Sequence, residues 1–372
     1  MGKGTSAIRR WLISIDQPLL GTVLLIISAG IWVSIASTPA IAIKLGLQPF
    51  YFVKQHITIL PVVLAIIVFL SVLSPKYIRV LSIVGYFGCV FLILCTLLFG
   101  SEIKGAKRWL DVFGFSLQPS EFLKPILSIT TAWLLSIQYK EPRFKGILYS
   151  VISIIIVIPL LLKQPDIGMT VILLSTWFAQ LFISGLSITM IVSAMVVGIT
   201  SLAGLYFALP HFADRINRFI FPNTEDNDLY QIERSLHAFK NGGLFGTGPG
   251  EGTVKMTIPD CHSDFVFSVI GEEFGFFACV AVILLFAVLV IRSILKALSA
   301  SNMFCFSAVF GLSIQIFIQT SINICSALHL IPTKGMTLQF ISYGCSSMLS
   351  SAICIGFMLA LTKNSALKTD KL

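Results

Sequence analysis

Long apolar stretches alternate with short polar segments along almost the whole chain. They cover approximately residues 18–38, 56–73, 79–99, 119–137, 146–163, 168–184, 188–208, 265–291, 303–326 and 338–362. Each is close to the length of about 20 mainly apolar residues that a helix needs to cross a bilayer. The pattern therefore predicts an all-α fold, a polytopic integral membrane protein with about ten transmembrane helices.

The polar segments between these stretches are short, with one exception. Residues 209–263 form a loop large enough to have structure of its own, within a single membrane domain that we expect to span residues 1–372. Ten spans place both termini on one side of the membrane. Lysine and arginine are more frequent in the loops of that side, as is typical of the cytoplasm. Residues 1–17 and 363–372 are then cytoplasmic tails, and 209–263 is an outer loop.

The composition agrees with a membrane protein and excludes an ordinary soluble domain. The mean hydropathy is +0.92, and 12% of the residues are charged, against about 25% in soluble domains. The net charge of +9 suits positive loops at an anionic leaflet, and no basic run suits nucleic acid. The eight cysteines lie mostly inside apolar stretches and show neither a disulfide framework nor a metal-binding spacing.

Three carboxylates stand where the long loop runs into an apolar stretch. Asp264 lies at the junction, and Glu272 and Glu273 follow just before the uninterrupted apolar run of residues 274–291. Ionisable groups near membrane depth usually mark a functional site, because an unpaired charge there costs several kcal/mol. We therefore expect a water-accessible mouth at this point. Alternatively, Asp264 caps the following helix, and Glu272 and Glu273 cap loops or pair with outer cations.

Further charged residues gather at the same expected side of the membrane. Glu121 and Lys124 stand three residues apart inside an apolar stretch, on one face of a helix. They either form an ion pair kept for packing or line a cavity, which is the commoner reason for charge at this depth. Arg108 and Lys334 lie in outer loops and could bind negative charge. Asp166 lies in a short outer turn, where a lone acid most often caps a helix or a turn.

The long outer loop offers little chemistry apart from Asp264. Residues 230–243 have a helical pattern, and the glycines that follow favour turns rather than nucleotide binding, because no strand precedes them. His237 and His262 lack the spacing of zinc ligands.

Six motifs, taken in order, resemble one known family over essentially the whole chain. They are KGAKRWL, QPSEFLK, QPDIG, YQIERSLHAFKNGGLFGTGPG, HSDFVFSVIGEEFG and PTKGMTLQFISYG. This combination resembles the SEDS family of shape, elongation, division and sporulation proteins. Within the family, residues 105–110 and 332–335 are more similar to the cell-division branch than to the elongation branch. The sequence departs from the family pattern at Gln339, where proline is common, at Cys345, which replaces a glycine, and at residues 325–329, where a glycine-rich run is usual.

The resemblance implies a peptidoglycan glycosyltransferase of the bacterial inner membrane, which polymerises lipid II at the periplasmic face during septal wall synthesis. It also implies a class B penicillin-binding protein, a transpeptidase, and other division proteins of the membrane as partners. Asp264 matches the family's catalytic aspartate, and four residues match polar positions of its central cavity: Arg108, Glu121, Lys124 and Asp166.

Glycan polymerisation needs a base for the acceptor hydroxyl and positive charge for the departing diphosphate. Asp264 can be the base, Arg108, Lys124 and Lys334 can receive the diphosphate charge, and Glu121 would hold Lys124 in place. No cofactor is certain from the sequence, although a divalent cation (Mg²⁺ or Mn²⁺) could share the task. Alternatives are an elongation-type polymerase, a lipid II flippase and a non-catalytic scaffold of the division complex.

Overall fold

The computed structural model describes most of the chain between residues 9 and 363. Outside the described residues lie 45, 104–105, 113–114, 301, 333–334 and all but a few isolated positions of 186–226. The expected seventh apolar stretch and Lys334 therefore fall largely or wholly outside them. So do residues 1–8 and 364–372 of the expected cytoplasmic tails and the first part of the expected outer loop.

Nine helices of the described part of the chain coincide with nine of the predicted apolar stretches. They are α2 (Gln17–Lys44), α3 (Tyr51–Val72), α4 (Pro75–Phe99), α5 (Pro119–Lys140), α6 (Gly146–Lys163), α7 (Ile167–Ile183), α11 (Val266–Leu298), α12 (Met303–Ala327) and α13 (Cys345–Leu361). Six of these, namely α2, α3, α4, α6, α11 and α12, are long and apolar enough to cross a membrane, and α7 and α13 are shorter apolar helices. The mainly helical, multi-pass architecture predicted from the sequence is confirmed.

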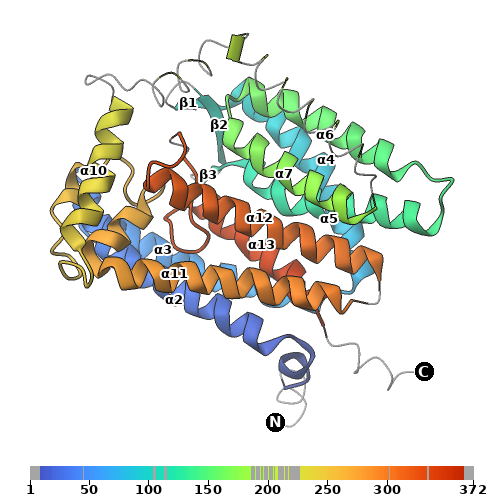
Figure 1. Cartoon of the computed structure of the whole chain (residues 1–372), viewed down its shortest axis with the longest axis horizontal. Coiled ribbons are helices and arrows are strands. Elements are labelled where there is room, and N and C mark those ends of the chain that lie inside the picture. Colours follow the sequence, from blue (N-terminus) through green and yellow to red (C-terminus); the bar gives the residue numbers. More distant parts are fainter. Residues whose placement is uncertain are drawn as a thin grey trace.

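The helix α12 lies at the centre of the bundle (Figure 1). It packs against α5, α7 and α11, while α13 packs against α3, α5 and α12. In an apolar 18-residue stretch of α12, 61% of the residues are buried, against 28% in the corresponding stretch of α4. The reason is chemical, because α12 carries buried amides such as Gln319 and Asn323, whereas α4 presents Phe87 and Phe91 outwards.

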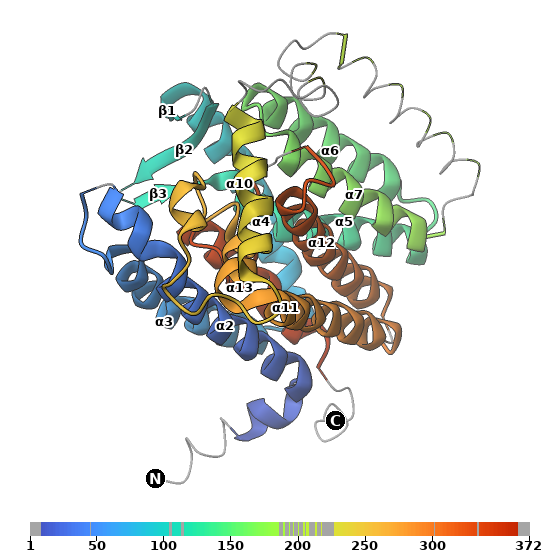
Figure 2. The same ribbon diagram turned by 60° about the vertical axis from the view of Figure 1, so that its left-hand side comes forward.

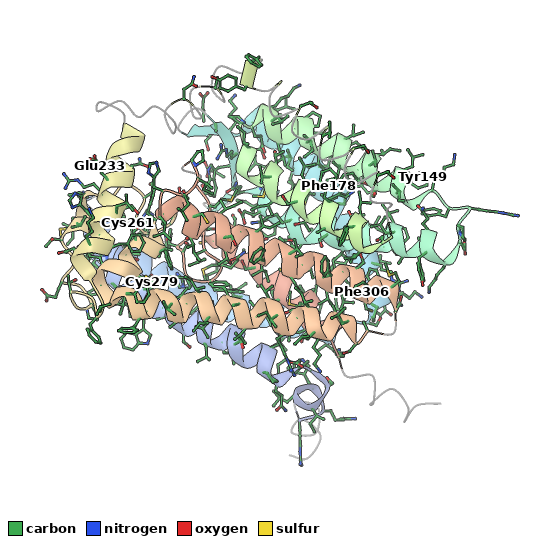
Figure 3. All side chains as sticks on the ribbon, in the orientation of Figure 1. Tyr149, Phe178, Glu233, Cys261, Cys279 and Phe306 are labelled. Carbon is green, nitrogen blue, oxygen red and sulfur yellow. The ribbon has the colours of Figure 1, made fainter. Side chains whose placement is uncertain are left out.

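One end of the bundle carries the sheet of strands described below, and we call it the sheet end. Helix α10 (Asn227–Gly242) and the short 3₁₀ helix η1 (Val254–Thr257) lie there, and α10 crosses in front of the bundle in Figure 2. Figure 3 labels Glu233 of α10 and Cys261 at this end, and Phe306 at the other. The helical pattern expected at residues 230–243 is thus confirmed as α10.

A small antiparallel sheet is the feature that the all-α prediction missed. Strands β1 (Ser101–Ile103), β2 (Ala106–Val112) and β3 (Phe115–Leu117) are ordered β1-β2-β3. The outer strands have three residues each, which is too short for an alternating apolar pattern to be recognised.

Helix α11 is broken at Gly275, inside the apolar stretch that was expected to run on uninterrupted. Gly275 has φ 78° and ψ −174°, and a Cβ atom there would lie 2.4 Å from the backbone nitrogen of Gly246. Only glycine tolerates both constraints. The break frees backbone amides, which the loop satisfies: Phe276 N donates to Gly243 O at 3.0 Å. The glycine-rich loop is thereby inserted into the kink.

The last predicted stretch begins too early, because residues 335–344 are not helical. This segment, which we call the re-entrant segment, is buried nonetheless, with Leu338 and Ile341 at most 1% exposed. Phe340 has φ 60°, and a Cβ atom at Gly30 of α2 would lie 2.1 Å from its carbonyl oxygen. The helix α13 starts only at Cys345. The segment was mistaken for helix because burial makes it apolar.

The opposite end of the bundle is held by a buried carboxylate. Asp16 accepts hydrogen bonds from Arg292 at 2.9 and 3.1 Å, forms an ion pair with Lys296 at 3.0 Å, and accepts from the amide of Leu19 at 3.0 Å. Burial alone would raise the pKa of Asp16, but these hydrogen bonds lower it below its ordinary value. Asp16 thus joins the start of α2 to the end of α11.

Asp16→Asn is expected to lower the free energy of unfolding by about 1–3 kcal/mol at neutral pH. A carboxylate with a lowered pKa stabilises the fold above the unfolded-chain value of about 3.9 and loses that contribution as the pH falls through the folded value. Thermal unfolding in detergent at pH 7 and pH 3 should therefore show a difference from wild type that shrinks at pH 3. An equal difference at both pH values would contradict this account.

Candidate active site

Asp264 lies in the turn that precedes α11, with its carboxylate against the re-entrant segment. A Cβ atom on Gly335 would lie 2.7 Å from Asp264 Oδ2. The N-cap position of α11 is occupied by Phe265, not by Asp264, and the Phe265 side chain makes no capping hydrogen bond. The alternative in which Asp264 caps the helix is therefore not what the structure has. Instead, the absence of a side chain at Gly335 makes room for the carboxylate.

Four hydrogen bonds join the turn of residues 262–264, the re-entrant segment and α12 to one another. Asn323 Nδ2 donates to the carbonyl of Asp264 at 3.0 Å and to that of Met336 at 2.5 Å. Ser342 Oγ donates to Ser263 O at 2.6 Å, and Tyr343 N donates to the carbonyl of residue 262 at 2.9 Å. Asn323 is fully buried, and its amide holds two backbone stretches next to the carboxylate, namely the turn at Asp264 and the re-entrant segment at Met336.

A second amide on α12 connects this site to the buried charge pair. Gln319 Nε2 donates to Thr337 O at 2.9 Å, and Gln319 Oε1 accepts from Lys124 Nζ at 2.7 Å. Lys124 also pairs with Glu121 at 2.8 Å, and both are buried. The expected pairing of Glu121 with Lys124 is confirmed. Because Gln319 and Asn323 stand four residues apart, they share one face of α12.

Gln315 continues this face by a further turn and borders a small, partly polar cavity of about 10 Å³ beside Lys124. Neither the Oε1 of Gln315 nor the Nε2 of Gln339 has a hydrogen-bond partner among the described residues, although both side chains are buried. A cavity of this size and polarity has room for about one water molecule. Gln339, a departure from the family pattern, is held by Thr320, whose hydroxyl donates to Gln339 Oε1 at 3.0 Å.

Arg108 and Asp166 both stabilise the turn between α6 and α7. Arg108 Nε donates to Gln164 O at 3.1 Å, and its Nη2 donates to Pro165 O at 2.6 Å. Asp166 is the N-cap of α7 and accepts from Met169 N at 3.3 Å. The capping role expected for Asp166 is confirmed. A role of either residue in binding substrate stays a prediction.

The start of α7, directly after this turn, comes close to the catalytic candidate at two glycines, Gly168 and Gly335. A Cβ atom on Gly168 would lie 2.3 Å from the terminal methyl carbon of Met336, the residue after Gly335. The start of α7 and the re-entrant segment are therefore in direct contact, next to the glycine that makes room for the Asp264 carboxylate.

Glu272 and Glu273 are both buried and hold the loop in front of α11. Glu272 accepts hydrogen bonds from the backbone amides of Val254 and Lys255, each at 2.7 Å. Glu273 forms an ion pair with Lys255, whose ammonium also donates to Ala36 O at 2.9 Å. The interpretation of these two acids as loop caps and cation partners is confirmed.

Sequence reasoning missed Gln319 and Asn323, although they carry most contacts of the site. The signal available was the run of amides at positions 315, 319 and 323, spaced by four residues in an otherwise apolar helix. Buried amides at that spacing indicate a polar neighbour on one face.

Comparison with known proteins identifies the family. A family model described as "Cell cycle protein", covering FtsW, RodA and SpoVE, matches residues 17–367. The chain belongs to this family. The match takes in all nine bundle helices of the described residues, and the resemblance drawn from the motifs is thereby confirmed.

Individual relatives agree over nearly the full length. The chain is 37% identical to a probable peptidoglycan glycosyltransferase FtsW of Caulobacter vibrioides, over 96% of this chain and 92% of the relative. It is 33% identical to the protein of the same name from Legionella pneumophila, over 93% of this chain and 90% of the relative.

Two solved structures have the same fold. One was determined in a study of the structural coordination of polymerization and crosslinking by a peptidoglycan synthase complex, with TM-score 0.77, 24% identity and coverage of 94% of this chain and 97% of that one. The other is the rod shape determining protein RodA of Thermus thermophilus, with TM-score 0.67, 25% identity and coverage of 94% and 96%.

Asn323→Leu should loosen the re-entrant segment, because two buried carbonyls lose their donor. The expected loss is about 1–3 kcal/mol in the free energy of unfolding. Hydrogen–deuterium exchange of residues 335–344 should become faster. The matched control is Gln315→Met on the same face of α12, where the amide oxygen has no partner to lose and the change should be nearly neutral. Equal effects of the two variants would contradict the assigned contacts.

Proposed function

We propose that this protein is a peptidoglycan glycosyltransferase of the division branch, which polymerises lipid II into glycan strands. Family membership and the names of the closely matching relatives support this activity. The observation that carries the site assignment is the Asp264 carboxylate placed over Gly335, at the end of the bundle where α11 begins. The turn that carries this carboxylate is held at its backbone by Asn323 and Ser342, and the space left at Gly335 accommodates the carboxylate itself.

Asp264 acts as the general base in this proposal. Its carboxylate accepts the proton of the acceptor sugar's 4-hydroxyl as the oxygen attacks the anomeric carbon of the donor sugar. The bond from that carbon to the lipid diphosphate breaks, and the diphosphate leaves with the electron pair. One base and a good leaving group suffice for a single inverting displacement, and general-base catalysis of this kind contributes about 10²- to 10⁴-fold in rate.

Positive charge near the leaving diphosphate supplies the second requirement. Lys334 immediately precedes Gly335 in the sequence and is our first candidate. Lys124 is 2% exposed and contacts Glu121 and Gln319. We therefore propose that it makes the electrostatic potential of the cavity more positive and does not contact the phosphate directly. Arg108 acts indirectly, by holding the α6–α7 turn through its hydrogen bonds to the carbonyls of Gln164 and Pro165.

A divalent cation would need ligands beyond those that the described residues supply. Among the described residues, no three acidic, histidine or cysteine side chains come together as a metal cage. If Mg²⁺ or Mn²⁺ takes part, we propose that Asp264 supplies one oxygen and the substrate diphosphate and water supply the rest, in keeping with the ligands these ions prefer.

The proposed setting is the bacterial inner membrane at the division septum, with both termini cytoplasmic and the sheet end facing the periplasm. The bias of lysine and arginine toward one side supports this orientation. We propose a class B penicillin-binding protein as partner, together with other division proteins. The similar structure from a complex that coordinates polymerization and crosslinking supports such a pairing.

Asp264→Asn should abolish polymerisation, to below a few per cent of wild type, because an amide cannot accept the proton. The test is reconstitution of each purified protein, alone and with its transpeptidase partner, followed by gel analysis of glycan strands from labelled lipid II. Thermal unfolding checks that the variant is folded. Strands from the variant would remove Asp264 as the base. If folded, partner-bound wild type makes none, a flippase or a scaffold becomes the better account.

Gly335→Ala should reduce polymerisation at least about tenfold with little loss of stability, because its methyl group would displace the Asp264 carboxylate. The matched control is Gly344→Ala in the same segment, where an added Cβ meets neighbours only at an ordinary 3.7 Å. Initial rates of strand formation for both variants measure the effect. Similar rates for the two variants would show that the contact at Gly335 does not position the carboxylate.

A further inference from the structure

A second site opens at the sheet end, on the face formed by α4, α6 and the sheet. It is an open groove of about 570 Å³, within the range of small-molecule pockets. Its wall is apolar and consists of four leucines: Leu94, Leu97, Leu98 and Leu160. Three charged residues, Glu102, Lys107 and Lys163, also line the groove, together with Pro165.

Two lysines of this lining give the groove a net positive charge. Lys107 of β2 is half-buried and Lys163 at the end of α6 is exposed. Within the described part of the chain, neither ammonium forms a hydrogen bond or an ion pair within 4 Å. Glu102 stands opposite Lys107 in the strand register and offsets one of the two charges. The groove therefore combines hydrocarbon surface with spare positive charge.

Arg108 connects this groove to the candidate active site. Its two hydrogen bonds fix the carbonyls of Gln164 and Pro165, and this anchors Lys163 beside the strand that carries Lys107. Pro165 lines the groove, and three residues later Gly168 contacts Met336 of the re-entrant segment. The α6–α7 turn and the first turn of α7 together thus touch both the groove and the segment that contains Gly335.

We propose that the groove binds the lipid diphosphate portion shared by the substrate and the released carrier of the polymerisation reaction. The two ammonium groups take the diphosphate oxygens as point charges, and the leucines take the first isoprenoid units. A diphosphate suits the excess positive charge better than a zwitterionic phospholipid head group does. The inference rests on the proposed function for the identity of the lipid, but its binding can be measured without turnover.

The test is binding of undecaprenyl diphosphate to the purified full-length protein in detergent, measured by native mass spectrometry. The double variant Lys107→Gln/Lys163→Gln should bind at least about tenfold more weakly than wild type, as expected for the loss of two charge-assisted contacts. The charge-matched control is Lys54→Gln/Lys240→Gln, which removes two exposed lysines from elsewhere at the sheet end and should bind within about twofold of wild type.

A second variant tests the apolar wall with both lysines kept. Leu97→Trp should fill the groove and weaken binding of the same lipid, while thermal unfolding remains close to wild type. Phosphatidylglycerol and phosphatidylethanolamine serve as comparison lipids, and their binding should not change with the lysine variant.

Unchanged diphosphate binding in the lysine variant would overturn the proposal. An equal loss for the diphosphate and for phosphatidylglycerol would also overturn it, because the groove would then be a general surface for anionic lipid. Wild type that binds the diphosphate through the groove but forms no strands would refute the proposed polymerase activity without refuting the groove.

Discussion

The hydrogen bonds from Asn323 to the carbonyls of Asp264 and Met336 are the constraint on which the site depends. Non-helical backbone near membrane depth is tolerated only where protein or water satisfies its polar groups. Residues 335–344 have such a backbone, and the side-chain amides of α12 satisfy part of its carbonyl groups. This requirement explains why α12 lies at the centre of the bundle and why its buried face is polar.

The buried charges follow from the same arrangement. Lys124 is stabilised by the carboxylate of Glu121 and by the carbonyl oxygen of Gln319, while the amide nitrogen of Gln319 holds Thr337. A buried ion pair is poor evidence of stability, because desolvation offsets much of the attraction. The benefit of the pair here is specificity. Through Gln319, it fixes the register of α5 and α12 against the re-entrant segment at Thr337, two residues beyond Gly335.

The sequence alone could predict whatever depends on local patterns. Apolar length predicted the bundle helices, three-residue spacing predicted the ion pair of Glu121 with Lys124, and a lone acid in a short turn predicted the cap at Asp166. It could not predict features that arise from packing between distant segments. The break at Gly275 depends on a loop some thirty residues earlier in the chain, and the partners of Asn323 are known only once three separate segments meet.

A double-mutant cycle on the turnover number for strand formation tests the central claim most directly. If Asn323 and Gly335 both act by placing the Asp264 carboxylate, the double variant Asn323→Leu/Gly335→Ala should be no slower than the slower single variant, within about twofold, because coupled residues are not additive. Losses that multiply would mean that the two residues act independently. The re-entrant segment would then not be the element through which α12 positions the carboxylate.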